Sequence, residues 1–375
     1  MTTGDLFLPR IIPERIREAR EARGYTREAF AEALGITAQA VAQYEVGQHS
    51  PGPEIMGRII GLTAQPPAFF TADRPSVRER FGTPYWRSLV RMNRADRLRI
   101  ARRLEWSADI VAYVERFIEL PRINLPTGEP VEDFTNLEWL EIAAEALREK
   151  WGLGSLPIEY LAPTLEANGV VLIKEPVRCA DMDAVSRWQA GRPFILLSED
   201  KHSLPRENFD LAHELAHLIC HPHVEVTSEN LATIERQANY FAGALLLPRK
   251  SFPREVISTS LDYFLELKKH WRVSVQAMVY RCKELGLLNK NQVAYLWRQI
   301  GRRKSEPLDD AFEPERPTLL SAALSMLIQN GVQSRAQIIE ALKLSHSDIE
   351  QLSGTSPGFL DQKVIPLEFK RKRLS

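Results

Sequence analysis

The chain has 375 residues and a mass of 42.7 kDa, which is more than one ordinary hydrophobic core requires, so we expect two or three domains. Its 49 lysines and arginines balance 49 aspartates and glutamates, which excludes a wholly basic nucleic-acid coat and a polyacidic solvating protein. With 44% hydrophobic and 26% charged residues, the composition is that of a folded globular protein.

The cysteines and the apolar runs indicate the compartment. Cys179, Cys220 and Cys282 lie far apart without a CxxC pair, which favours free thiols in a reducing compartment. No apolar run approaches the roughly 18 residues of a membrane span. Residues 1–10 lack the basic start and long apolar stretch of a signal peptide. We therefore expect a cytoplasmic protein with no membrane partner.

Composition and periodicity divide the chain into five segments. Residues 8–72 and 318–375 have helical patterns, and residues 126–300 contain a small strand cluster followed by helices. Residues 73–125 form an arginine-rich helical connector, and residues 301–317 have the charged, proline-containing composition of a linker. This order predicts a multidomain, mainly α chain: an all-α N-terminal domain, an α+β middle and a helical C-terminal region. We see no internal repeat.

The first segment predicts three helices joined by tight turns. A helical period covers residues 16–23 and is broken at Gly24, after which Thr26 can cap a second helix. The third helix is expected from Ala38 to about Tyr44. The residues expected to face inward are Phe30, Ala33, Leu34, Val41 and Tyr44.

The turn between the second and third helices is typical of a DNA-reading helix–turn–helix. Leu34-Gly35-Ile36-Thr37 supplies a helix end, a glycine turn and a new cap. Gln39 and Gln43 lie one turn apart on the exposed face, and glutamine can bond an adenine edge. A helical bundle that recognises protein is the alternative.

Residues 12–70 resemble the lambda-repressor-like, XRE-type DNA-binding domain. The matching residues are Thr26-Arg27-Glu28, Ala31, Leu34-Gly35-Ile36-Thr37, Tyr44-Glu45-Val46-Gly47, Pro51 and Pro53. The chain departs from many members in having Arg27 for glutamine and Ala38 at the first recognition position. The resemblance implies DNA contacts from Arg27, Thr37, Gln39 and Gln43, and a double-stranded operator as partner.

Charge is distributed unevenly around this segment. Residues 1–75 contain eight arginines and nine acidic residues, so their net charge is −1. Residues 76–103 contain nine arginines against Glu79 and Asp96, a net charge of +7. These arginines recur at near-helical spacing and could contact phosphates, or pair with acidic groups of other domains. Both interpretations stay open.

Strands and helices are expected beyond the connector. A helical period covers residues 136–150, and residues 169–174 are β-branched and apolar, which predicts a strand. Residues 184–188 and 193–197 flank Gln-Ala-Gly-Arg, which predicts a hairpin. Most of the chain from there to residue 289 is helical in period. Residues 319–327 and 336–344 predict a C-terminal helical pair, and residues 370–373 form a basic tail.

A metal-binding pattern lies between residues 209 and 221. His213 and His217 are four residues apart, so on a helix both imidazoles project from one face and can bind one ion. Glu214 beside them can take a proton from the water that attacks a peptide carbonyl. Two histidines on a core helix without a metal are the alternative.

A second helical segment begins at Ile234 and offers further ligands. Glu235 can be the third ligand, and Asn239 on the same face can hold a ligand histidine by a hydrogen bond. His221, one turn beyond His217, competes as a ligand, as do Cys220 and, more weakly, His223.

Residues 137–288 resemble the ImmA/IrrE family of metallo-endopeptidases. The motifs are His213-Glu214-Leu215-Ala216-His217 with His221, Glu235-Arg236-Gln237-Ala238-Asn239-Tyr240-Phe241-Ala242, and Leu246-Leu247-Pro248. The resemblance implies a compact gluzincin-like zincin fold with His213, His217 and Glu235 as ligands, Glu214 as general base, and His221 outside the ligand set. The donors suit Zn²⁺, and Mn²⁺ or iron also fits them.

The two resemblances together predict a transcriptional switch operated by proteolysis. We expect a bacterial, DNA-binding regulator whose metal-dependent endopeptidase domain cleaves a partner repressor, or the chain itself, in a stress response or mobile-element control. The alternative is a repressor or antitoxin-like regulator whose zincin-like domain senses a signal without cleaving. A homodimer is the default for an XRE-type module.

Overall fold

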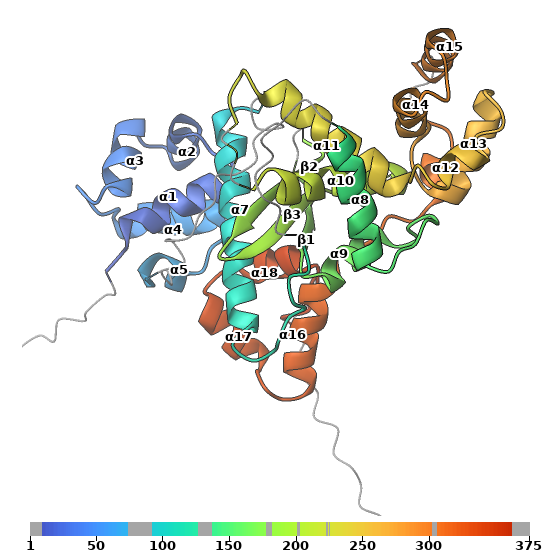
Figure 1. The fold of residues 1–375 in the computed structure, drawn as a ribbon. Helices are drawn as coiled ribbons and strands as arrows, with labels where there is room; N and C mark the ends of the chain where they lie inside the picture. The colour runs from blue at the N-terminus through green and yellow to red at the C-terminus, as the bar shows by residue number, and fades with distance from the viewer. Residues whose placement is uncertain are drawn as a thin grey trace, which may run out of the picture.

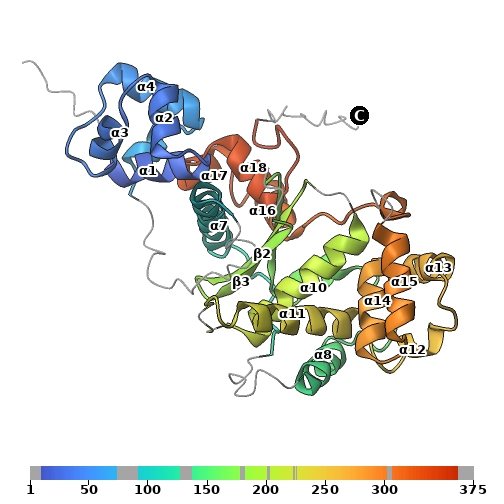
Figure 2. The ribbon, with the colours of Figure 1, turned by 90° about the horizontal axis from the view of Figure 1, so that it is seen from above.

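The structure is a computed structural model that describes residues 10–73, 92–126, 137–177, 182–200, 203–222, 224, 226–301 and 306–361. Its many helices around a small central sheet confirm the expected mainly helical, multidomain fold (Figures 1 and 2). Among these residues, no helix combines the length and the apolar character that crossing a bilayer requires. The predictions for Arg78–Arg91, Cys179, His223 and the tail at 370–373 lie outside the described residues.

The N-terminal domain consists of α1 (Pro13–Ala22), α2 (Arg27–Leu34), α3 (Ala38–Glu45), α4 (Pro53–Thr63) and α5 (Pro67–Thr71). The side-chain hydroxyls of Thr26 and Thr37 cap α2 and α3. They accept hydrogen bonds from the backbone N–H groups of Ala29 and Ala40, at 3.1 and 3.2 Å. Gly35 ends α2 in the left-handed conformation, at φ 66°. The helix boundaries predicted from these residues are therefore confirmed.

One expected core position of α2 is wrong. Phe30 and Leu34 are buried as predicted, but Ala33 is exposed, and Ala31 is buried instead. A helix advances by about 100° per residue, so a face centred between Leu34 and Ala31 turns Ala33 towards solvent. Val41 of α3 is buried, and Tyr44 packs on the same core while partly exposed.

The predicted connector is largely one long helix, α7 (Arg94–Val114), which lies between the N-terminal domain and the sheet (Figure 2). Trp106 of α7 is fully buried, donates a hydrogen bond to Glu18 at 2.6 Å and packs edge-on against Phe69. The N-terminal domain and α7 thus share one core. The segment is a structural layer and not a spacer.

Three arginines of α7 bond to other parts of the chain. Arg99 donates to the backbone carbonyls of residues 176 and 177, each at 2.7 Å. Arg102 pairs with Glu21 and Glu105. Arg103 pairs with Glu175 and Asp348 and is buried. For these positions the structure favours internal pairing over phosphate contact.

The central sheet has three strands: β1 (Val171–Glu175), β2 (Ala184–Gln189) and β3 (Arg192–Ser198), in the order β1-β3-β2. β1 runs parallel to β3, and β2 and β3 form the predicted antiparallel hairpin. Ala190 and Gly191 both have positive φ, 50° and 81°, as a two-residue type I′ hairpin turn requires.

The two faces of the sheet bury different layers. Leu172, Ile195 and Leu197 point towards the helices of the middle domain. Val171, Ile173 and Leu196 point towards α7 and the C-terminal helices. Successive strand residues alternate between faces, so the sheet joins two cores.

The middle domain surrounds one face of the sheet with helices. Its central pair, α10 (Leu204–Cys220) and α11 (Leu231–Leu246), pack against each other. The other helices are α8 (Glu138–Lys150), α9 (Leu161–Ala167), α12 (Phe252–Glu255), α13 (Leu261–Trp271), α14 (Val275–Glu284) and α15 (Lys290–Gly301).

The predicted linker is fixed to the middle domain where it is described. It includes the 3-10 turn η2 (Asp309–Ala311). Glu306 accepts hydrogen bonds from buried Lys268 and from the first N–H groups of α14. Glu315 accepts the N–H of Ala162 at the start of α9. These carboxylates satisfy helix N-termini, so residues 306–317 form a strap across the domain.

The C-terminal region has three helices instead of the predicted pair: α16 (Leu319–Gln329), α17 (Arg335–Leu342) and α18 (His346–Ser353). Ser345 caps α18 by accepting the N–H of Asp348, and Lys343 ends α17 in the left-handed conformation. The apolar pattern of α18 is too short to distinguish it from the end of α17 by period alone. α16 and α18 contact both α7 and β1.

Candidate metal centre and DNA-reading helix

The helix α10 carries the histidine motif on one of its faces. Leu211, Leu215 and Leu218 are buried and anchor the helix in the core. His213 and His217, four residues apart, project from the other side towards α11, with 8% and 2% of their surface exposed. Their Nε2 atoms are 3.0 Å apart. The spacing of the motif therefore brings both imidazoles to one point, as the sequence predicts.

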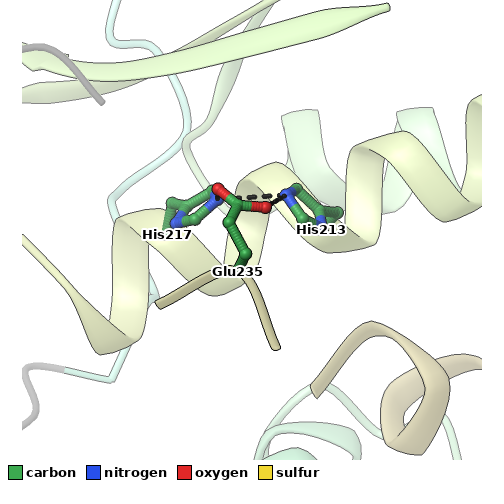
Figure 3. Close-up of side chains that lie close together, drawn as sticks. All are labelled: His213, His217 and Glu235. Atoms are coloured by element: carbon green, nitrogen blue, oxygen red, sulfur yellow. Dashed lines mark hydrogen bonds and ion pairs between the residues drawn. The ribbon is translucent and has the colours of Figure 1, made fainter. Parts of the chain in front are cut away.

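The neighbouring helix α11 adds Glu235 to the pair (Figure 3). Its Oε2 lies 3.5 Å from His213 Nε2, and its Oε1 lies 3.7 Å from His217 Nε2. Each of the three residues offers one ligand atom, and these atoms all lie within 4.8 Å of one another. In the described part of the chain this is the group of histidine, cysteine and acidic residues that could hold a metal ion.

The donor set fits a divalent metal ion. Tetrahedral ligands at roughly 2 Å from one ion lie about 3.3 Å from each other. The separations of 3.0, 3.5 and 3.7 Å bracket that value. Two neutral imidazoles and one carboxylate suit zinc, and manganese or iron also accept them.

Asn239 holds the first histidine. Its Oδ1 lies 3.0 Å from His213 Nδ1, so it accepts the proton of that nitrogen. This hydrogen bond fixes the ring and directs the unprotonated Nε2 towards Glu235. Asn239 thus contacts the side of His213 that faces away from the three-residue cluster.

His221 and Gln237 hold the second histidine in the same way. His221 Nδ1 lies 3.2 Å from His217 Nδ1, and His221 Nε2 donates to Gln237 Oε1 at 2.8 Å. Burial lowers the pKa of His221 to about 4, against the opposing effect of the Gln237 hydrogen bond, so the ring is neutral at pH 7. With its Nε2 protonated, His221 accepts the proton of His217 Nδ1, and His217 Nε2 is left free to bind an ion.

The structure thus places His221 behind His217 and outside the three-residue cluster. Cys220 is buried, and burial raises the pKa of its thiol, so it is a poor source of thiolate. Gln237 was missed by the sequence reasoning. A glutamine among the mostly apolar residues of α11, where a buried amide needs a hydrogen-bond partner, is the signal that could have identified it.

Glu214 follows His213 on α10 and is buried, with 8% of its surface exposed. Its position next to a candidate ligand is that of a general base in the motif. A buried ion pair between Lys174 Nζ and Glu207 of α10, at 2.7 Å, ties the first turns of the helix to β1. The helix that carries the site is therefore braced against the sheet.

The predicted DNA-contacting residues lie on α2 and α3. Thr37 is engaged as the cap of α3, Gln39 is exposed and Gln43 is partly buried. Arg27 donates to Glu45 at 2.8 Å, and 44% of its side chain remains exposed. Hydrogen bonding to Glu45 also raises the pKa of Arg27. Exposed Gln39 is thus presented on the first turn of the helix that such a domain inserts into the major groove.

Family models match both the N-terminal helices and the segment that holds the histidine cluster. A model described as Helix-turn-helix matches residues 16–69, and a peptidase-family model described as IrrE N-terminal-like domain matches residues 165–283. No curated protein matches the chain significantly. The chain therefore carries, in this order, an XRE-type helix-turn-helix domain and an IrrE-like domain of the Peptidase M78 family.

Proposed function

We propose that this protein is a DNA-binding regulator whose metal-dependent endopeptidase domain cleaves a partner regulator, or the chain itself, and thereby switches gene expression. The cluster of His213, His217 and Glu235 beside Glu214 carries the proposal, because it lies within the segment that matches the peptidase family. The helix-turn-helix domain supports a role at an operator, and hence in the bacterial cytoplasm. Stress response and mobile-element control are the settings that we expect.

The roles of the residues follow from their positions. His213, His217 and Glu235 would hold the metal ion, which when bound supplies a Lewis acid that polarises the scissile carbonyl and the attacking water. Glu214 takes the proton of that water and passes it to the leaving amine nitrogen. Asn239 and His221 keep the two imidazoles in the tautomer that presents Nε2.

We further propose that the functional division follows five segments. Residues 8–72 bind DNA, residues 126–300 carry the peptidase site, and residues 318–375 brace the two against each other. Residues 73–125 and 301–317 join these units. The packing of α7 in one core with the N-terminal and C-terminal helices, and the hydrogen bonds of the strap to the middle domain, support this role of the two connectors. Two copies of the chain would read the two halves of a palindromic operator.

Cleavage by purified protein tests the enzymatic half. We would incubate the full chain, loaded with Zn²⁺ or Mn²⁺, with repressors encoded beside its gene. The comparison is between the wild type, Glu214→Gln and the control Glu229→Gln, which alters an exposed carboxylate. We expect cleavage by the wild type and the control only, with equal metal content in all three.

Two outcomes would contradict the proposal. Cleavage by Glu214→Gln at the wild-type rate would exclude its role as the general base. If no neighbouring regulator and no bond of the chain itself is cut while operator binding is intact, the domain acts as a non-cleaving sensor in a repressor or antitoxin-like regulator.

A further inference from the structure

Most arginines of the N-terminal domain are already paired within the protein. This matters because non-specific affinity for DNA comes mainly from cations that neutralise phosphates. A domain with a net charge of −1 has few of these to offer. Among these pairs are Arg15–Glu18, Arg20–Glu45, Arg23–Asp348 and Arg58–Glu54. Arg17 and Arg27 also pair with Glu45, but 44% of the Arg27 side chain stays exposed, so its outer face can still meet a phosphate.

The first turn of α7 lies against the start of α2. A cavity of about 250 Å³ is lined on one side by Thr26, Arg27 and Glu28, and on the other by Arg94 and its helical neighbours. Figure 1 shows α7 next to α2, on the side of α2 away from α3. Arg94 and Arg27 thus reach the same hollow from two segments that are far apart in the sequence.

The packing of α7 fixes this arrangement. A Cβ added to Gly24, in the turn before α2, would lie 3.3 Å from Cδ of Arg99. Gly24 has φ 75°, so the turn needs glycine both for its conformation and for the close approach of α7. Arg102, on the same helix, pairs with Glu21 of α1. Arg94 is therefore held at a defined place relative to α2.

Arg94 differs from Arg99, Arg102 and Arg103 of the same helix, and it is more exposed than Arg97, which is partly buried. Arg99, Arg102 and Arg103 bond to carbonyls or carboxylates of the chain, whereas Arg94 is exposed and pairs with no other residue of the described chain. The nearest acid on its own turn, Asp96, is bonded to the capping residue Asn93. Glu28 on the far rim is the exposed carboxylate of the hollow.

We propose that the first turn of α7 extends the DNA-contacting surface beyond the helix-turn-helix domain, with Arg94 and Arg27 neutralising neighbouring phosphates of one duplex backbone. This inference rests on the proposed DNA binding. In a helix–turn–helix the first helix crosses the DNA backbone while the second enters the major groove, so the start of α2 lies near phosphates. Arg94 shares that location although it lies outside the matched residues 16–69.

The salt dependence of binding tests this proposal. Each phosphate contact contributes about 0.9 to the slope of log K against log salt concentration. We expect Arg94→Ala to reduce that slope by about 0.9, equally on the upstream region of the protein's own gene and on an unrelated duplex. From about 50 to about 200 mM salt, the affinity advantage of the wild type over the variant then shrinks roughly 3.5-fold.

A matched control lies at the other end of the connector. Arg116 is also exposed, but it lies about 30 Å along the chain from Arg94 at helical rise and lines a different cavity. Arg116→Ala should leave the slope unchanged, and Arg27→Ala should reduce it as Arg94→Ala does. Circular dichroism and melting temperature verify that each variant is folded.

The outcomes separate this inference from the proposed function. If Arg94→Ala keeps the wild-type slope while Arg27→Ala and Gln43→Ala weaken binding, the protein binds DNA and α7 takes no part. An equal loss in Arg94→Ala and Arg116→Ala would mean a general effect of net charge and would also overturn the inference. If the wild type binds no duplex, both proposals are wrong.

Discussion

Substitution of Asp348 by asparagine is the most informative single change outside the metal site. The side chain of Asp348, on α18, is only 2% exposed and receives hydrogen bonds from Arg23 of the N-terminal domain and from Arg103 of α7. Gln65 and Ser345 also donate to it, at 2.5 and 2.6 Å. One carboxylate thus joins the DNA-binding domain, the connector helix and the C-terminal helices.

The expected loss of stability follows from the burial of this cluster. Removing one partner of a buried ion pair costs about 3–5 kcal/mol because the remaining charge is uncompensated. We expect the low end, about 3 kcal/mol, because Arg103 keeps Glu175 and the side chain of Arg23 is 23% exposed. At roughly 2–4 °C per kcal/mol, the melting temperature of the unit should fall by about 6–12 °C.

The effect should depend on pH. Burial opposes the ionisation of Asp348, but hydrogen bonding to Arg23 and the charges of Arg103 and Arg23 outweigh it, so the pKa lies well below its ordinary value. A carboxyl group with a lowered folded-state pKa stabilises the protein above its unfolded pKa of about 3.9. That contribution is lost as the pH falls towards the folded-state value. The difference between wild type and Asp348→Asn should therefore narrow from pH 5 to about pH 3.

Thermal unfolding with native-state hydrogen exchange measures this prediction. Exchange should accelerate in α1 and α18, whose contact depends on Asp348, and less in α10. The control is Asp310→Asn, which neutralises an exposed carboxylate. The reasoning from the buried cluster is refuted if Asp348→Asn is no more destabilising than Asp310→Asn. It is also refuted if the stability of the wild type and that of Asp348→Asn depend on pH in the same way.

Three further predictions concern the metal centre and the DNA-reading helix. His221→Ala should weaken metal binding by about 10–100-fold, measured by chelator competition, because His217 loses the partner that fixes its tautomer; unchanged affinity would exclude that role. Zinc at about 100 times its dissociation constant should stabilise the wild type by about 2.7 kcal/mol in thermal unfolding, and a chelator should reverse this; an equal gain in His213→Ala would place the ion elsewhere. Gln43→Ala should reduce the preference for operator over unrelated DNA by about 1–3 kcal/mol in a competition assay, whereas equal losses on both would argue against base reading.

The sequence predicted the local features well. Thr26, Gly35 and Thr37 determine the helix ends around the DNA-reading turn, because a cap or a left-handed residue acts within one turn of the helix. The Ala190–Gly191 turn determines the hairpin register for the same reason. The spacing of His213 and His217 is also local, since four residues on any helix place two side chains on one face.

Partners distant in the sequence were harder to predict. Gln237 becomes a partner of His221 only because α11 packs against α10, and the α11 motif alone leaves its side chain without an assigned role. Likewise, the sequence shows the net charge of residues 76–103 but not the partners of the arginines that the structure describes there. Arg103, for example, donates a hydrogen bond to Asp348, which lies 245 residues further along the sequence.

The sequence by itself therefore determined the helix-turn-helix, the hairpin and the histidine motif, and the balance of 49 cations with 49 anions was visible from composition alone. Only the tertiary structure decided which of those charges meet. It paired most described arginines of the N-terminal domain, and three of α7, with other groups of the chain. It also converted the linker into a strap and left Arg94 exposed beside Arg27. The physical reason is that capping, turns and helical spacing act within a few residues, whereas ion pairs depend on the folding of distant segments onto one another.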